Sequence, residues 1–193
     1  MKKIVGNTIE LIPVQESHIQ ALSSAWNDLR YVPHTEESKQ WFLYRTNSCN
    51  NAFDWNLSQK GNLYLSIIDK ALNIPIGYTL ITIKPFISEA TFKFTIIAQE
   101  HRELGRYSEL NILRHKFVYQ ENSAIQRTVT KLHQNSERQK NTLAALYTRE
   151  DFYEDSFRGP FIWSSITREE WDSWISDPAQ EPKRNSTFLI QDI

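Results

Sequence analysis

Glycine is scarce in this chain, and its few copies lie far apart. The 193 residues include only five glycines, whereas the usual frequency of about 7% would give roughly 13. They are Gly6, Gly61, Gly77, Gly105 and Gly159. Phosphate-binding loops of the dinucleotide and P-loop types each need at least two glycines within a few residues. The sequence therefore excludes both loop types, and any anion site built on a glycine must use one isolated position.

The overall charge and the cysteine content predict a soluble protein of the cytoplasm. The chain has 22 Lys and Arg against 23 Asp and Glu, so its net charge is near zero. A charge balance of this kind does not attract the protein to nucleic acid or to an anionic membrane. Cys49 is the only cysteine, which excludes an intrachain disulfide. The first residues are too polar for a signal peptide, and no apolar segment approaches the length of a membrane span. The histidines lack metal-ligand spacing, so we expect no metal site.

Hydrophobic periodicity predicts a mixed sheet with helices between some of its strands. Segments rich in alternating β-formers are expected to be strands, namely 9–14, 62–68, 76–83, 91–97, 126–132 and 161–166. Helical spacing predicts helices over 17–29 (with Ser17 as N-cap), 36–45, 110–117 and 142–149. Residues 46–61 are expected to form a loop, and 69–75 a hairpin connection. Hairpin-linked strands precede strand–helix–strand crossovers, which is typical of a mixed sheet.

The chain is expected to form one domain. It contains no internal repeat, low-complexity tract or interior linker. We expect the domain to cover residues 1–176. Residues 177–193 are polar and include two prolines, so they are expected to form a loosely held tail.

The segment around Gly105 is a candidate anion site. An expected strand ends near residue 97, a turn passes through Gly105, and an expected helix follows. The first N–H groups of a helix have no partner within it, and the helix dipole favours negative charge there. Arg102 and Arg106 flank Gly105, so a pyrophosphate would meet both N–H groups and guanidinium charge. The alternative is an ordinary strand-to-helix turn with two solvated arginines.

Several short motifs occur in the order in which the GNAT superfamily of acyl-CoA-dependent N-acyltransferases carries them. The family's pyrophosphate loop, Arg or Gln-x-x-Gly-x-Gly or Ala, is matched at Arg102 and Gly105, with Tyr107 in place of the last small residue. The other motifs are Trp26-Asn27-Asp28, Ile76-Gly77, Leu146-Tyr147-Thr148-Arg149-Glu150-Asp151-Phe152 and Ser165-Ile166-Thr167-Arg168-Glu169-Glu170-Trp171. Asp151 replaces a glycine of the family. Over residues 8–175 the chain resembles this family, particularly the branch that acetylates the N-termini of ribosomal proteins.

The resemblance implies a fold and a cofactor. The fold is the GNAT fold, an α/β (α+β) architecture in which a mixed, mostly antiparallel central sheet has helices on both faces. Its fourth and fifth strands splay apart, and the pantetheine arm of acetyl-CoA (coenzyme A) inserts between them. The implied coenzyme contacts are Ile96, Ile97, Ala98, Arg102, Glu103, Leu104, Gly105, Arg106, Tyr107, Ser108 and Asn141. Helix capping explains Asn141 equally well, and Tyr107 would either block the site or pack aside.

The resemblance also implies a reaction, in which a primary amine attacks the thioester directly. This chemistry needs a base for the amine proton and an acid for the leaving thiolate. Tyr147 is at the matching position for the acid, although a core tyrosine fits the same position. Thr91 stands where the branch often has a glutamate, and Glu89 could serve as the base only with a shift of register. The alternative function is a GNAT-fold protein that has lost acetyl transfer and acts as a binding protein or as a different acyl or aminoacyl transferase.

The acceptor of the acetyl group is not identified by the sequence. Candidate acceptor-site residues are Trp26, Tyr31 and Tyr78, but large aromatic residues are more often part of a core or its rim. We expect a small-molecule amine or a protein N-terminus as the acceptor, with no nucleic-acid or membrane partner. The protein is expected to be a monomer or a homodimer.

Overall fold

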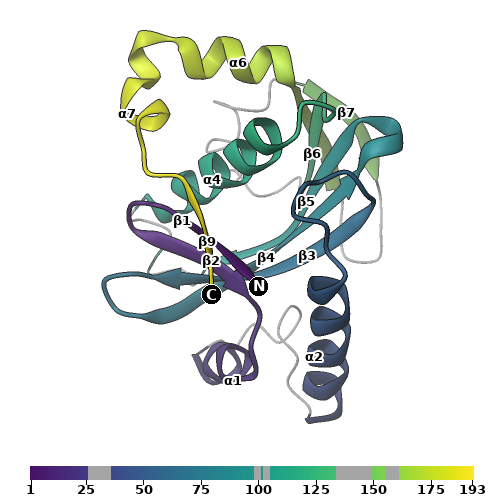
Figure 1. Ribbon diagram of the computed structural model, residues 1–193, viewed down its shortest axis with the longest axis vertical. Helices are drawn as coiled ribbons and strands as arrows, with labels where there is room; N and C mark the ends of the chain where they lie inside the picture. The colour runs from purple at the N-terminus through teal and green to yellow at the C-terminus, as the bar shows by residue number, and fades with distance from the viewer. Residues whose placement is uncertain (26–35, 98–100, 102–104, 134–148, 155–160) are drawn as a thin grey trace.

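The computed structural model describes residues 1–25, 36–97, 101, 105–133, 149–154 and 161–193 (Figure 1). Its strands are β1 (Lys2–Val5), β2 (Ile9–Pro13), β3 (Gly61–Asp69), β4 (Ile74–Lys84), β5 (Glu89–Ile97), β6 (Arg127–His133), β7 (Arg149–Glu154), β8 (Phe161–Thr167) and β9 (Leu189–Asp192). Its α-helices are α1 (Glu16–Ala25), α2 (Glu36–Asn51), α4 (Arg106–Glu121), α6 (Arg168–Ser176) and α7 (Glu181–Arg184). The short 3-10 helices are η1 (Pro85–Ile87) and η2 (Pro178–Gln180). All six expected strands are confirmed.

The described strands form one sheet in the order β7-β8-β6-β5-β4-β3-β2-β1-β9. Within it, β5 and β6 run parallel, and every other neighbouring pair is antiparallel. The parallel pair requires a crossover, which α4 provides between the two strands. The expected mixed, mostly antiparallel sheet is therefore confirmed.

Helices cover both faces of the sheet (Figure 1). The helix α4 lies on one face, where its apolar stripe packs into the main core with Leu110, Leu113 and Phe117. The helices α1 and α2 lie on the other face, where they contribute Ile19, Leu22 and Leu43. The apolar residues whose helical spacing predicted these helices are thus the residues that the helices bury. In the described chain, no helix is long and apolar enough to cross a membrane.

The helix α2 is longer than its sequence pattern predicts. It continues to Asn51, so the expectation of a loop from residue 46 is wrong for 46–51. The added turns carry no apolar stripe, and side-chain hydrogen bonds stabilise them instead. The strand β2 ends at Pro13, and the side-chain amide of Asn50 binds the backbone of Tyr64 on β3. Its oxygen accepts from the Tyr64 N–H at 2.8 Å, and its nitrogen donates to the Tyr64 carbonyl at 2.9 Å. A long-range contact of this kind has no local signal in the sequence.

Two further expectations are corrected by the structure. The helix α1 begins at Glu16, so Ser17 lies inside it and is not its N-cap. Arg149 begins β7 and is not helical, because Arg149 and Glu150 pair with Ser165 and Ser164 of β8 and tertiary pairing overrides local spacing. Residues 142–148, which the same helix was expected to include, lie outside the described residues.

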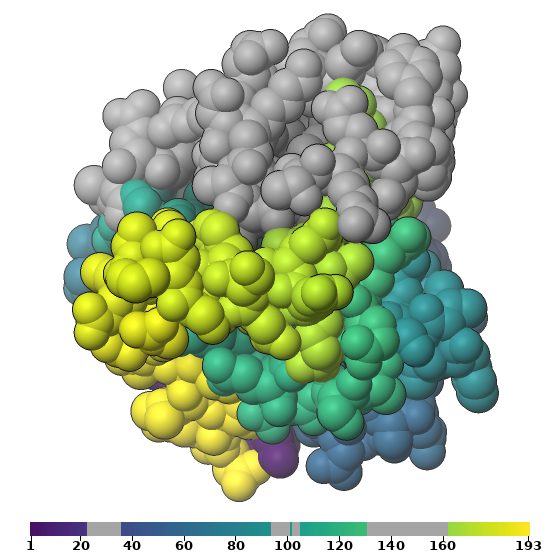
Figure 2. Space-filling model, turned by 90° about the horizontal axis from the view of Figure 1, so that it is seen from above, coloured from purple at the N-terminus to yellow at the C-terminus, as the bar shows by residue number. Residues whose placement is uncertain are grey.

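The C-terminal segment is not a loosely held tail. Its last strand, β9, pairs with β1 from Lys2–Asp192 to Val5–Leu189 and forms an edge of the sheet. The ammonium of Lys116 on α4 donates to the carbonyls of Arg184 at 3.0 Å and Ser186 at 2.7 Å. Figure 2 shows α6 as a yellow-green band and the C-terminal segment that follows it in yellow. The strand pairing, the buried Lys116 and the packing of Phe188 and Ile190 against the main core therefore hold this segment.

Candidate functional site

Two neighbouring inner strands of the sheet, β5 and β6, pair in parallel over only a short stretch. Among the described residues, β5 and β6 pair from Glu89–Arg127 to Phe92–Thr130 and no further. At the same level β5 contains a bulge against β4, because Leu80 is paired with Lys93 but Tyr78 is paired with Ile96. An extra residue bends and twists the bulged strand. Lys93, Ile96 and Ile97 of β5 are therefore paired with β4 on one side, and no described residue of β6 pairs with Ile96 or Ile97 on the other.

The helix α4 begins with a backbone conformation that requires glycine. Gly105 is its N-cap, with φ of 74° and ψ of −3°, in the left-handed region that side chains disfavour. A Cβ atom at this position would have no heavy atom within 4 Å, so the requirement comes from the backbone angle and not from crowding. No side chain in the described part of the chain caps this helix end. The first N–H groups of α4 and its dipole thus favour an anion at the loop.

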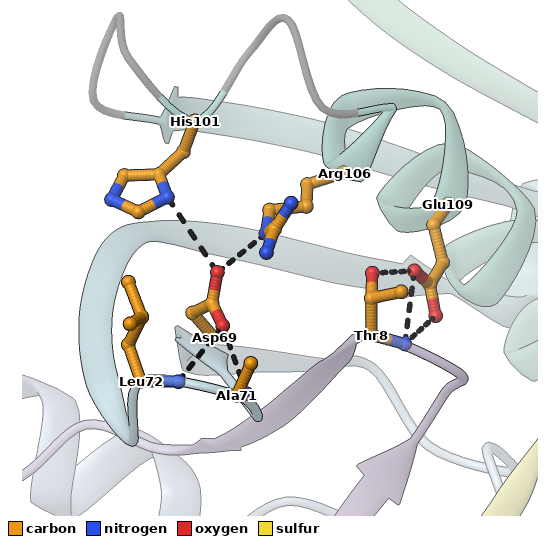
Figure 3. A network of polar contacts seen from close by, with 7 residues as sticks. All are labelled: Thr8, Asp69, Ala71, Leu72, His101, Arg106 and Glu109. Atoms are coloured by element: carbon orange, nitrogen blue, oxygen red, sulfur yellow. Dashed lines mark hydrogen bonds and ion pairs between the residues drawn. The ribbon is translucent and has the colours of Figure 1, made fainter.

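The side chain of Arg106, the first residue of α4, lies against a buried carboxylate (Figure 3). Its Nε donates to Oδ2 of Asp69 at 2.5 Å, and the Asp69 side chain has no exposed surface. Asp69 ends β3, and its Oδ1 accepts from the N–H groups of Ala71 at 2.9 Å and Leu72 at 3.2 Å in the hairpin turn. Burial acts to raise the pKa of Asp69, but the hydrogen bond and charge of Arg106, together with these N–H groups, lower it overall.

His101 approaches the same carboxylate from the other side of the loop (Figure 3). Its Nδ1 lies 3.5 Å from Oδ2 of Asp69, and the residue is buried. Among the described residues this Nδ1 has no hydrogen-bond partner. Asp69 therefore lies between residues that precede and follow segment 102–105.

A second carboxylate in the first turn of α4 reaches across to the turn between β1 and β2 (Figure 3). Glu109 accepts from the backbone N–H of Thr8 at 2.9 Å and also from the Thr8 hydroxyl. The approach is so close that a Cβ atom at Gly6 would overlap the Glu109 carboxylate. The isolated Gly6 thus allows α4 to contact the N-terminal hairpin.

The other described residues of the expected coenzyme loop are Tyr107 and Ser108, and both are partly buried. The ring of Tyr107 packs against the main apolar core. Since the ring is directed at the core, this packing supports the alternative in which Tyr107 lies aside and leaves the backbone available. The backbones of Ile96 and Ile97 lie on the part of β5 that β6 does not pair.

Glu89, the expected base, is held by two cations at the start of β5. Its carboxylate accepts from Lys84 at 2.7 Å, from Arg127 at 3.1 Å and from the Thr91 hydroxyl at 3.1 Å. Burial acts to raise the pKa of Glu89, but the hydrogen bond and charge of Lys84 and the contacts of Arg127 and Thr91 lower it overall. A carboxylate with a lowered pKa is a weak proton acceptor.

Tyr78, an expected acceptor-site residue, is buried in the core on the face covered by α1 and α2. Its ring lies 5.6 Å from that of Phe42 and packs in one cluster with Leu22. This position supports the interpretation of Tyr78 as a core residue. The other expected site residues lie outside the described residues: Trp26, Tyr31, Ala98, Arg102, Glu103, Leu104, Asn141 and Tyr147. Among the described residues, no cluster of side chains could hold a metal ion.

Two charged residues near this site were not expected from the sequence. One is Asp69, which read as part of a hairpin turn. The other is Arg114 of α4, which is almost fully buried, lies 4.7 Å above the Phe92 ring and donates to the Thr79 hydroxyl at 3.2 Å beside the bulge. Its spacing of four from Leu110 and three from Phe117 puts Arg114 on the apolar stripe, which is a signal that the sequence does contain.

Comparison with known proteins identifies the fold. No protein-family model and no curated protein matches the sequence. A GCN5-related N-acetyltransferase from Brucella melitensis superposes with a TM-score of 0.70 at 14% identity, covering 94% of this chain and 83% of that one. Mycobacterium smegmatis RimJ, in complex with CoA-disulfide, gives 0.69 at 11%, covering 92% and 95%. The ribosomal-protein-S5-alanine acetyltransferase from Vibrio fischeri gives 0.65 at 14%, covering 86% and 98%. The chain has the GNAT fold.

Proposed function

We propose that the protein is an N-acetyltransferase that moves an acetyl group from acetyl-CoA to a primary amine. The observation that carries this proposal is the combination of an unpaired edge of β5 with the Gly105 start of α4 just after it in the chain. An extended pantetheine arm can bind the first through backbone hydrogen bonds, and a pyrophosphate suits the second. The likeness to structures of acetyltransferases, one of them with CoA-disulfide, supports the same proposal.

The residues proposed to hold the coenzyme follow the chain from β5 into α4. The arm would pair with the backbone of Ile96, Ile97 and Ala98. The pyrophosphate would bind the loop from Arg102 to Ser108, with Asn141 at the edge of the site. The charge on this side of the fold favours the assignment, because the Asp69 carboxylate is already compensated by Arg106 and does not face the loop as a free negative charge.

The chemistry proposed is direct attack of a neutral amine on the thioester carbonyl. The carbon–nitrogen bond forms, the carbon–sulfur bond breaks, and Tyr147 protonates the leaving thiolate to a thiol. The proton that the amine loses passes to water, and the Tyr147 phenolate regains a proton from solvent. Replacing Tyr147 with Phe is expected to lower kcat by at least about 100-fold, the usual size of general acid catalysis. The affinity for acetyl-CoA should change little, since the hydroxyl acts on the leaving sulfur.

The acceptor proposed is an α-amino group, such as a protein N-terminus. Glu89 is held in ion pairs and is therefore a weak base for an ammonium group. The proposed acceptor is thus an amine of which a large fraction is already neutral at the working pH. At pH 7.5 an α-amine with a pKa of 7.7–8.0 is about 30% neutral, whereas a lysine amine with a pKa near 10.4 is only about 0.1% neutral. Structures named for ribosomal-protein acetyltransferases among the similar folds favour the same acceptor class.

The experiment uses acetyl-CoA with two peptides that differ only in their amine. One has a free N-terminus and no lysine, and the other has a blocked N-terminus and a single lysine. Calorimetry should detect binding of acetyl-CoA to the protein. The kcat/KM for the peptide with the free N-terminus should exceed that for the lysine peptide at least about tenfold. Absence of binding at millimolar acetyl-CoA would refute the proposed function, and a preference for lysine would refute the proposed acceptor.

A second candidate function is a GNAT-fold protein that binds coenzyme A without acetyl transfer. The pairing of Glu89 with Lys84 and Arg127 favours it, since this removes the expected base from catalysis. Under this alternative, calorimetry detects binding of coenzyme A to the protein, but no amine in a broad panel causes release of the thiol from acetyl-CoA. Rapid thiol release with one amine excludes it.

A further inference from the structure

One buried carboxylate joins the two ends of the loop that is proposed to hold the pyrophosphate. Asp69 contacts His101, which precedes segment 102–105, and Arg106, which follows it. It also holds its own hairpin turn through the N–H groups of Ala71 and Leu72. Figure 3 shows His101 and Arg106 converging on Asp69 from the α4 side, while the turn lies on the other side.

The burial of Asp69 makes these contacts obligatory. A carboxylate without exposed surface is costly unless charge and hydrogen bonds compensate it. The turn supplies two N–H groups, and of the residues that the structure describes only Arg106 supplies a full opposite charge at hydrogen-bond distance. The Arg106 side chain is therefore fixed on Asp69, and the first residue of α4 is fixed with it.

We propose that Asp69 is a positioning residue for the coenzyme pyrophosphate. Through Arg106 it sets the start of α4 relative to the sheet, so that the first N–H groups of this helix face the phosphates, and it does not itself contact the coenzyme. This inference rests on the proposed function. A GNAT fold does not need a buried carboxylate at this position. Apolar packing alone could hold the first turn of α4, in the way that Tyr107 packs against the main core.

A positioning role predicts a defect that depends on the pyrophosphate. Replacing Asp69 with Asn keeps an oxygen acceptor for the turn but removes the charge that holds Arg106. The KM for acetyl-CoA should rise at least about tenfold, as expected for losing charge-assisted contacts, while kcat changes less than about twofold. With S-acetylpantetheine, which has the same thioester but no pyrophosphate, kcat/KM should stay within about twofold of the wild type.

The matched control is Glu10→Gln, which breaks the partly buried ion pair with Lys3 at 3.1 Å, on the hairpin of β1 and β2. It should leave KM for both donors unchanged.

If Asp69→Asn does not fold, Asp69→Ser carries the test, because a hydroxyl can also accept from turn N–H groups. A KM for acetyl-CoA that stays at the wild-type value in the folded variant overturns the inference while the proposed function stands. Equal loss with both donors also overturns it, since that result indicates a general structural defect. A wild type that neither binds nor uses acetyl-CoA refutes the proposed function and this inference with it.

Discussion

His115 is expected to make the protein sensitive to mild acid. The residue is completely buried in α4, where its ring stacks 4.8 Å from Trp171 and meets the Phe92 ring edge-on at 5.0 Å. Its Nδ1 lies 2.6 Å from the Asn111 carbonyl, which fits a neutral ring that donates from Nδ1. Burial lowers the pKa of His115 to about 3, and the charge of Arg114 acts in the same direction, against the opposing effect of the Asn111 hydrogen bond.

The size of the effect follows from the difference between the folded and unfolded states. In the unfolded chain the pKa of a histidine is about 6.5, so below that pH the unfolded state binds a proton that the folded state does not. The contribution is fully present above pH 6.5 and is lost as the pH falls toward about 3. Between pH 8 and pH 5 the loss spans about 1.5 pH units, and at 1.36 kcal/mol per unit it amounts to about 2 kcal/mol.

The assay compares the wild type with His115→Phe, which keeps an aromatic ring but cannot titrate. Urea unfolding, followed by tryptophan fluorescence, gives the free energy of unfolding of each protein at pH 8 and pH 5. The variant is expected to be less stable at pH 8, and the wild type should lose about 2 kcal/mol more than the variant on going to pH 5. Burial also lowers the pKa of His18, but that contribution is common to both proteins and cancels. Parallel pH profiles would refute the reasoning, because they would mean that His115 is not kept neutral by burial.

Two more predictions test the site. Gly105→Ala should lower the free energy of unfolding by about 1 kcal/mol, since φ of 74° disfavours a side chain while the space around Cβ is open; a loss well above about 3 kcal/mol in urea unfolding would contradict this. Glu89→Gln should lower the free energy of unfolding by about 1 kcal/mol through loss of its partly exposed ion pairs with Lys84 and Arg127. Its kcat should stay within about threefold of the wild type, and a loss of about 100-fold or more would assign the base to Glu89 after all.

The sheet and α4 could be predicted from the sequence because their signals are local. Alternation over 91–97 predicts a strand, and the spacing of Leu110, Leu113 and Phe117 records which face of α4 is buried. The length of α2 could not be predicted in the same way, because its last turns depend on Asn50 binding the backbone of Tyr64. The strand β9 likewise depends on pairing with β1, at the opposite end of the chain.

The candidate site was predictable in outline, and its charges were not. Gly105 could be identified because a left-handed residue before a helix is a property of a single position. The ion pairs of Arg106 with Asp69 and of Glu89 with Arg127 could not, since each joins residues that only the sheet brings together. Asp69 lies 37 positions before Arg106, and Arg127 lies 38 positions after Glu89. An arginine beside a glycine indicates available charge in the sequence, whereas in the structure that charge already compensates a buried carboxylate.

The scarcity of glycine is compatible with a coenzyme loop because few positions of the site require glycine. In the described part of the loop, Gly105 alone has a positive φ, and the residues after it are helical. At position 107 a small residue is therefore not needed for the backbone, and Tyr107 uses the position to pack against the core. Gly6 is needed for a different reason, since Glu109 approaches too closely for a side chain there. One glycine thus shapes the start of α4, and another allows the contact of this helix with the N-terminal hairpin.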